Sequence, residues 1–120
     1  MQHPVHKGFM AKNYINNNDF EIWVSGYNAS GFYEIELWTS FELLFKNIFS
    51  SYRFNVEEDD ARQECMLLLL RTVRNFTPDK GRAFNYFTTV ILNNLRLLYT
   101  KNQKHYNRLE ELILESNQDD

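Results

Sequence analysis

Apolar residues recur every three or four positions through much of this 120-residue chain, and this spacing constrains the fold more than any other feature. The clearest run lies between residues 33 and 52, where the repeating positions are Leu37, Trp38, Phe41, Leu44, Phe45, Ile48, Phe49 and Tyr52. On a helix these side chains form one broad apolar stripe. Four glycines and two prolines leave little material for the turns of a β fold. The sequence therefore predicts an all-α protein, a compact bundle of four to five helices.

Capping and turn residues divide the pattern into separate helices. The run Asn16–Asp19 supplies N-cap side chains for a first helix over about 18–26, and Ser25–Gly31 is typical of a linker. A second helix is expected over about 33–52. A third begins at Asn55 or Val56, and its acidic first turn suits the positive end of a helix dipole. Its predicted buried side comprises Met66, Leu67, Leu69, Leu70, Val73 and Phe76.

Pro78 and Gly81 predict the next turn, and a fourth helix should run from about Ala83 to Lys101 or beyond. The expected organisation is a tail at 1–13, a helical domain at 14–108 and an acidic-hydrophobic tail at 109–120. The N-terminus lacks the apolar core of a signal peptide, and no apolar run approaches the roughly 20 residues of a membrane span. The lone Cys65 fits a reducing compartment, so we expect a soluble, cytoplasmic protein.

The net charge of −3 conceals a strong asymmetry along the chain. Between Asp19 and Glu64 there are ten acidic and three basic residues, whereas between Arg71 and Arg108 eight basic residues accompany only Asp79. Nucleic-acid binding depends on local fields within about 8–10 Å, so this basic segment is compatible with it. Solvated helix faces that happen to segregate are an equal alternative.

Nothing in the sequence indicates an enzyme. It contains no glycine-rich phosphate loop and no Cys/His cluster at metal-ligand spacing. Cys65 lies within the third predicted helix, far in sequence from His105, which argues against a Cys/His nucleophile. We therefore expect no catalytic residue, no metal and no cofactor.

Residues 60–98 carry a motif that begins with Asp60-x-x-Gln63-Glu64 and an apolar helix, and continues with Phe76-x-Pro78-x-Lys80-Gly81-x-x-Phe84 and an aromatic-rich helix. This motif resembles region 2 of bacterial RNA polymerase sigma factors. The small size and the segment Tyr14–Phe20 are most similar to the late-transcription sigma factors of T-even-like phages, which keep region 2 and lack a second domain for the −35 element. The resemblance implies a sigma region 2-like bundle.

Polymerase-binding residues implied by the resemblance are Asp60, Gln63 and Glu64. In the family this helix docks on the clamp helices of the β′-type polymerase subunit. Residues at this spacing project from one helix face and can make charge-assisted hydrogen bonds to a basic partner. Helix capping and ordinary surface charge are the alternative, which we prefer for Glu57 and Glu58.

DNA-binding residues implied by the resemblance lie on the fourth helix and just before it. In the family, aromatic residues capture bases flipped from the non-template strand of the −10 element, and Phe87 occupies the position of the base-stacking tyrosine. Because Tyr86 and Phe87 are adjacent, they cannot both face inward, while Phe84 is expected in the core. Val90 and Ile91 stand where primary sigma factors carry a tryptophan pair, which puts unaided DNA melting in doubt. The full predicted set is Arg82, Tyr86, Phe87, Val90, Ile91, Asn93, Asn94, Arg96, Lys101 and Lys104.

The asparagines of this set, Asn93 and Asn94, fall where the family reads the upstream edge of the −10 element, and asparagine can pair bidentately with adenine. Solvent-facing helix amides explain them equally well. The basic side chains, His105 and Arg108 among them, are candidates for phosphate contacts, although cations near a helix end also suit its dipole.

The C-terminal segment carries Leu109, Leu112 and Ile113 among acidic residues. Phage late sigma factors end in an acidic-hydrophobic motif that binds the replication sliding clamp, and these residues match it in type. A helix that continues onto the core, or contact with a transcription coactivator, would explain them as well.

The sequence thus leads to one expected function and one alternative. The expected protein is a sigma-like transcription initiation factor that binds the bacterial RNA polymerase core and directs it to a −10-like element for late transcription. The resemblance implies that a phage encodes it. The alternative is a sigma mimic that occupies the clamp helices and inhibits or redirects the polymerase without reading DNA.

Overall fold

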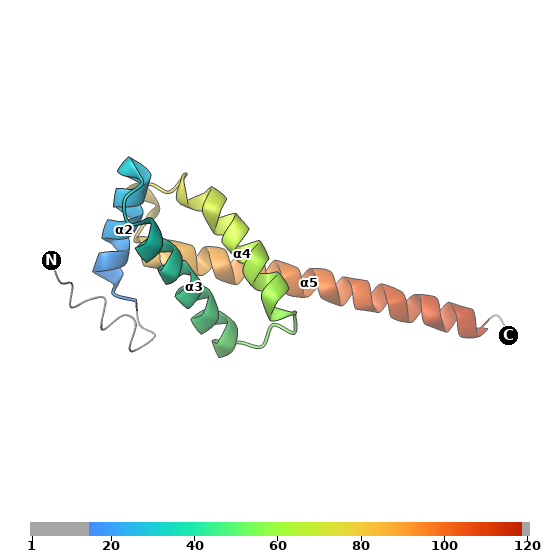
Figure 1. Ribbon diagram of the computed structural model, residues 1–120. Coiled ribbons are helices and arrows are strands. Elements are labelled where there is room, and N and C mark those ends of the chain that lie inside the picture. The colour runs from blue at the N-terminus through green and yellow to red at the C-terminus, as the bar shows by residue number, and fades with distance from the viewer. Residues whose placement is uncertain (1–14, 119–120) are drawn as a thin grey trace.

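Four α-helices and one short 3₁₀ helix make up residues 15–118, the part of the chain that the computed structural model describes (Figure 1). They are α2 (Asn17–Ser30), α3 (Glu34–Ser51), α4 (Glu58–Val73), η1 (Pro78–Lys80) and α5 (Ala83–Gln118). This range contains no strand, so the predicted all-α helical bundle is confirmed. The N-terminal tail predicted at 1–13 lies outside the described residues.

Helix α2 begins where the sequence predicts but ends later. The Asn16 side chain accepts hydrogen bonds from the backbone N–H groups of Asn18 and Asp19, both at 3.0 Å. The linker predicted over 25–31 is wrong, because the helix continues through Gly26 to Ser30 and stops only at Gly31. Gly31 has φ +76°, a conformation that glycine adopts without steric cost, and its N–H donates to the carbonyl of Tyr27. Gly26 serves a different purpose, since a Cβ atom there would lie 2.6 Å from the Tyr33 ring.

Helix α3 matches its prediction closely, whereas α4 starts later and buries a different side. Asn55 has φ +52° and Glu57 caps the helix, which therefore begins at Glu58. Four residues at four-residue intervals are buried, namely Ala61, Cys65, Leu69 and Val73. The predicted burial of Leu67 and Leu70 is wrong: 60% and 43% of their surfaces are exposed. A helix at the surface of a bundle buries only one side against the core. In α4 the buried side is the one that carries Cys65 and Leu69.

Helix α5 is continuous for 36 residues and contains no glycine or proline. Its first half packs in the bundle, and its second half projects beyond the other helices, as Figure 1 shows. The projection gives the molecule extents of 74 × 30 × 20 Å. The predicted tail at 109–120 is therefore helical as far as Gln118. Despite this length, no helix within 15–118 has an apolar stretch sufficient to cross a membrane.

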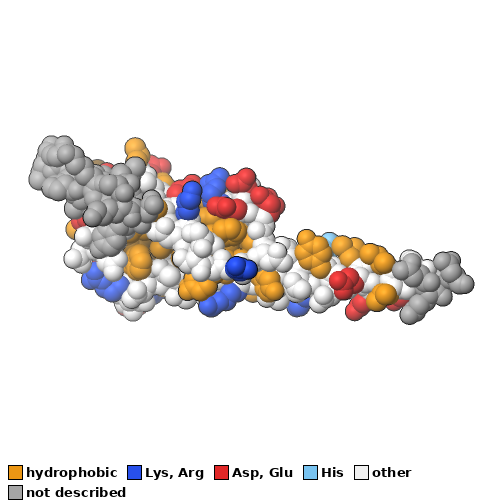
Figure 2. All heavy atoms as spheres, turned by 90° about the horizontal axis from the view of Figure 1, so that it is seen from below, with side chains coloured by type: hydrophobic (Ala, Val, Ile, Leu, Met, Phe, Trp, Pro, Cys, Tyr) orange, Lys and Arg blue, Asp and Glu red, His pale blue; other side chains and the backbone are white. Residues whose placement is uncertain are grey.

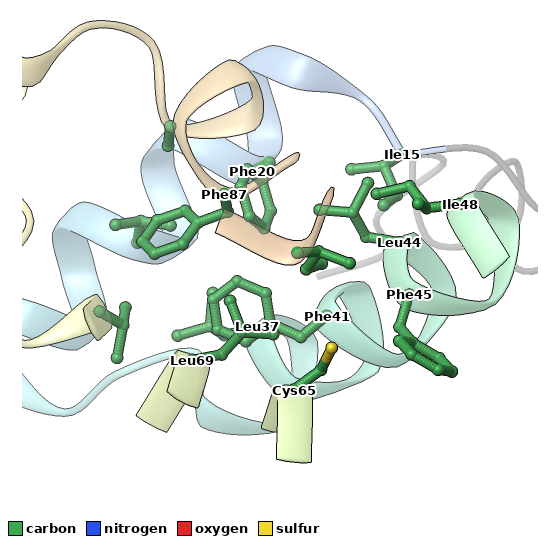
Figure 3. Close-up of a cluster of buried hydrophobic side chains, with 14 of the residues drawn as sticks. Ile15, Phe20, Leu37, Phe41, Leu44, Phe45, Ile48, Cys65, Leu69 and Phe87 are labelled. Carbon is green, nitrogen blue, oxygen red and sulfur yellow. The ribbon is translucent and has the colours of Figure 1, made fainter. Parts of the chain in front are cut away.

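Aromatic side chains occupy the centre of the bundle. Phe20 from α2, Phe41 from α3 and Phe87 from α5 have essentially no exposed surface. Figure 3 shows them in one cluster with Leu37 and Leu69, so all four helices contribute to a single core. Phe84 is half-buried against this core, its ring edge-on to that of Phe20, in agreement with its predicted core position.

Candidate protein and nucleic-acid interfaces

The three residues predicted to bind the polymerase lie together on the outer side of α4. Asp60, Gln63 and Glu64 are exposed, and their spacing places them on one side of the helix. The same side continues into Leu67 and Leu70, whose exposure leaves two large apolar side chains in solvent. We call these five residues the α4 outer face. Acidic and amide groups beside exposed leucines form a surface suited to a protein partner.

Glu57 has the capping role that we preferred for it. Its side-chain Oε1 accepts a hydrogen bond from the backbone N–H of Asp60 at 2.8 Å. This bond satisfies one of the N–H groups that the first turn of a helix leaves without an intrahelical partner. The Asp60 side chain remains exposed and available to a partner.

A groove of about 530 Å³ runs between the start of α4 and the middle of α5. Asp60, Gln63, Glu64 and Leu67 line it from α4, and Leu98, Lys101, Asn102 and His105 line it from α5. Lys101, predicted to contact DNA, therefore shares a groove with the residues predicted to bind the polymerase. The sequence could not indicate this proximity, because the two segments are some forty residues apart.

The side of α5 that faces away from the core carries polar and basic residues. Tyr86, Asn93, Arg96 and Lys104 lie on it at helical spacing, and Asn93, Arg96 and Lys104 are exposed. We call these four residues the α5 outer face. Tyr86 is half-buried, with its ring centroid 5.1 Å from that of Phe76 and 5.9 Å from the Lys80 ammonium nitrogen. An aromatic ring, an amide and several cations are the groups that bind single-stranded nucleic acid.

Arg82, just before α5, is engaged within the protein. Its guanidinium donates to the side-chain oxygen of Asn18 at 2.9 Å and lies 3.7 Å from a carboxylate oxygen of Glu21. The same Glu21 oxygen accepts the backbone N–H of Ala83 at 2.8 Å and so caps α5 from another helix. Arg82 therefore helps to fix the start of α5, although more than half of its side chain stays exposed.

Phe87 and Ile91 are misassigned by the sequence prediction. Both side chains are completely buried in the core, so in this fold neither can stack on a base or press on a base step. They lie four residues apart on the buried side of α5, in line with Leu95, and the Phe87 ring packs edge-on against Phe20 of α2 and Phe41 of α3. Of the adjacent pair Tyr86 and Phe87, only Tyr86 has accessible surface.

Val90 and Asn94 are half-buried at the edge of the same core. The Asn94 amide donates to Cys65 Sγ at 3.2 Å, so Asn94 faces α4 and only Asn93 is fully presented to solvent. Burial raises the pKa of the Cys65 thiol, and the hydrogen bond from Asn94 offsets this in part. Cys65 is therefore a protonated core residue at neutral pH.

The apolar residues of the C-terminal segment do not pack onto the bundle. Leu109, Leu112 and Ile113 are 41%, 52% and 59% exposed on the projecting part of α5. Figure 2 shows hydrophobic side chains along this projection with acidic side chains beside them. A helix does continue through this segment, but it does not pack onto the core, so the alternative of a helix that continues onto the core is wrong.

Three or more His, Cys, Asp or Glu side chains do not come together as a possible metal site anywhere in the described part of the chain. The structure thus brings together an acidic and apolar face on α4, a groove beside it, and a basic and polar face on α5. Comparison with known protein families, characterised proteins and solved structures found no match to this chain.

Proposed function

We propose that this protein is a sigma-like transcription initiation factor that binds a bacterial RNA polymerase core and directs it to a −10-like promoter element, for the late genes of a phage. The observation that carries the proposal is the presence of two faces with different chemistry on adjacent helices, the α4 outer face and the α5 outer face. A factor that joins a polymerase to a promoter needs one surface for each partner. The resemblance in residues 60–98 assigns these two roles to the same two helices.

The α4 outer face suits a basic helix of the polymerase clamp. The carboxylates of Asp60 and Glu64 can form charge-assisted hydrogen bonds with the cationic side chains of that helix. Leu67 and Leu70 can bury apolar surface against its apolar side-chain atoms. Complete burial of a leucine contributes about 1.5–3 kcal/mol relative to exposure. Apolar contact would therefore supply much of the affinity, while the acidic residues select a basic partner.

Fewer residues can bind DNA on the α5 outer face than the resemblance alone implies. Tyr86 is the aromatic side chain that can stack on a flipped base, which contributes about 1–3 kcal/mol per base. Asn93 can pair with adenine, and Arg96 and Lys104 can contact phosphates. One stacked base offsets only part of the cost of opening a duplex, so we expect promoter opening to depend on AT-rich or already strained DNA.

The burial of Phe87 and Ile91 favours a second candidate function. In this candidate the protein is a sigma mimic that occupies the clamp helices in the bacterial cytoplasm and inhibits or redirects the polymerase. It would use the α4 outer face and would not need the α5 outer face.

A transcription assay separates the two candidates. Purified bacterial core polymerase would be combined with this protein and with templates that carry AT-rich −10-like elements, either duplex or pre-melted. Initiation at a defined position that requires the protein supports the initiation factor, and initiation on pre-melted templates alone reveals weak melting. Polymerase binding without initiation on either template supports the mimic.

Glu64→Lys tests the face that both candidates share. Glu64 is exposed and lines the groove, so the change should leave the fold intact while placing a cation against a basic partner. Since a hydrogen bond to a charged group contributes about 1.5–3 kcal/mol, we expect polymerase affinity to fall by about tenfold or more. Glu34→Lys, at an exposed position in the first turn of α3, is the matched control. Equal affinities for both variants, with unchanged circular dichroism, would remove the α4 outer face from the proposal.

A further inference from the structure

The side of α5 that faces the core continues past the end of the bundle. Within the bundle this side carries Ile91, Leu95 and Leu98. At further steps of three or four residues the same side carries Asn102, His105, Leu109, Leu112 and Ile113. The last three remain 41–59% exposed, so a helix surface built to be covered is open to solvent.

Charge reverses sign along the same projecting segment. Lys101, Lys104 and Arg108 precede Leu109, whereas Glu110, Glu111 and Glu115 follow it. Two parallel copies of this segment would place like charges together, but two antiparallel copies would place the basic half of each beside the acidic half of the other. The charge pattern therefore favours an antiparallel copy of the same segment over a parallel copy.

We propose that a second copy of this chain docks against residues 105–116 of α5 as an antiparallel helix pair. Such a pair has two-fold symmetry, so the same surface serves both chains and no open-ended assembly results. The proposal goes beyond the proposed transcription function, because it requires neither polymerase nor DNA.

One register satisfies both the apolar and the charged residues. When Leu109 of one chain lies level with Leu112 of the second copy, the leucines and Ile113 meet along the seam. Arg108 and Glu115 are seven residues apart and so share one edge of that seam. A two-fold axis that reverses the helix direction brings like edges together. Arg108 of each chain then lies beside Glu115 of the other, giving two ion pairs.

The same geometry makes the association weak. Residues 105–116 extend over about 18 Å of helix, a small contact compared with that of stable dimers. Glu110 lies on the opposite edge of the seam and approaches its own counterpart, which opposes pairing. We therefore expect a dimer that exchanges readily and forms at high protein concentration.

Sedimentation equilibrium of the full chain tests this inference. Over about 10 μM to 1 mM, the apparent mass should rise from that of the 14.5 kDa chain toward twice that value. Arg108→Glu and Glu115→Arg should each weaken association by about tenfold or more, since each removes two ion pairs and creates two like-charge contacts. The double variant, with the charges exchanged, should recover most of the association. Lys46→Glu, at an exposed position on α3, is the control and should dimerise like the original chain.

Leu109→Gln is an independent test of the apolar contacts in the dimer, because it removes an apolar residue from the seam and replaces it with a good helix former. This variant should be monomeric over the same range, with unchanged helical circular dichroism. A chain that is monomeric at every concentration would overturn the proposal and leave this surface to a different protein. A dimer that survives Leu109→Gln, or a charge-exchanged variant that fails to recover, would also overturn it.

Discussion

Replacing Phe87 by alanine should destabilise the whole bundle rather than remove a DNA contact. The Phe87 ring has no exposed surface, and its centroid lies 6.1 Å from that of Phe20, 5.2 Å from Phe41 and 5.4 Å from Phe76. Truncation of a buried phenylalanine costs about 3–5 kcal/mol, because apolar burial is lost and a cavity remains. A domain of this size has a free energy of unfolding of about 5–15 kcal/mol, so this one change removes a large share of it.

Urea denaturation followed by tryptophan fluorescence measures this loss. Trp23 is buried and the Trp38 ring lies 5.2 Å from that of Phe41, so both indole groups report on the core that contains Phe87. The matched control is Val90→Ala, one turn along α5 at a half-buried position. It removes little buried surface and should cost about 1 kcal/mol or less.

The result that would refute this reasoning is a Phe87→Ala variant whose free energy of unfolding falls by less than about 1 kcal/mol. If that variant also bound polymerase normally and failed to open promoters, Phe87 would be on the surface and its assignment as a base-stacking residue would be restored.

Two further predictions concern the start of α2 and the core thiol. Asn16→Ala removes the side chain that accepts hydrogen bonds from two backbone N–H groups, and it should lower the free energy of unfolding in urea by about 1 kcal/mol. Asn16→Asp should retain most of that stability. Equal urea midpoints for the alanine variant and the original chain would contradict the capping role. Because burial raises the pKa of Cys65 above its ordinary value of 9.0, the folded chain keeps the thiol proton at a pH where the unfolded chain loses it. Stability should therefore fall as pH rises above about 9, and more steeply than in Cys65→Ala; parallel pH profiles for the two chains would contradict this.

Local sequence signals were sufficient for most helix positions. The three- and four-residue spacing in 33–52 predicts α3 almost to its ends, and Asn16 and the turn at Pro78–Gly81 match observed boundaries. These signals act through a residue's own backbone and near neighbours, so they are readable without the fold. The prediction of a linker at 25–31 is wrong because it assigns Gly26 to a turn, whereas Gly26 lies within α2 and leaves room for the ring of Tyr33.

The side of a helix that is buried could not be predicted as reliably from the sequence. Helix α4 carries leucines almost all round, at 67, 68, 69 and 70, so its periodicity does not single out one stripe. Leu67 and Leu70 lie at helical spacing from the polar residues Asp60, Gln63 and Glu64. This spacing was the one sequence signal that could have placed both leucines on the α4 outer face.

By itself, then, the amino-acid order determined the helical class, the caps formed by Asn16 and Glu57, and the reversal of charge between Arg108 and Glu110, because each depends on residues close in the chain. Tertiary packing decided that Phe87 and Ile91 are core, that Lys101 shares a groove with Glu64, and that Glu21 caps α5. Those outcomes depend on how helices distant in sequence cover one another. A helix offers several sides, and only its neighbours determine which of them water can reach.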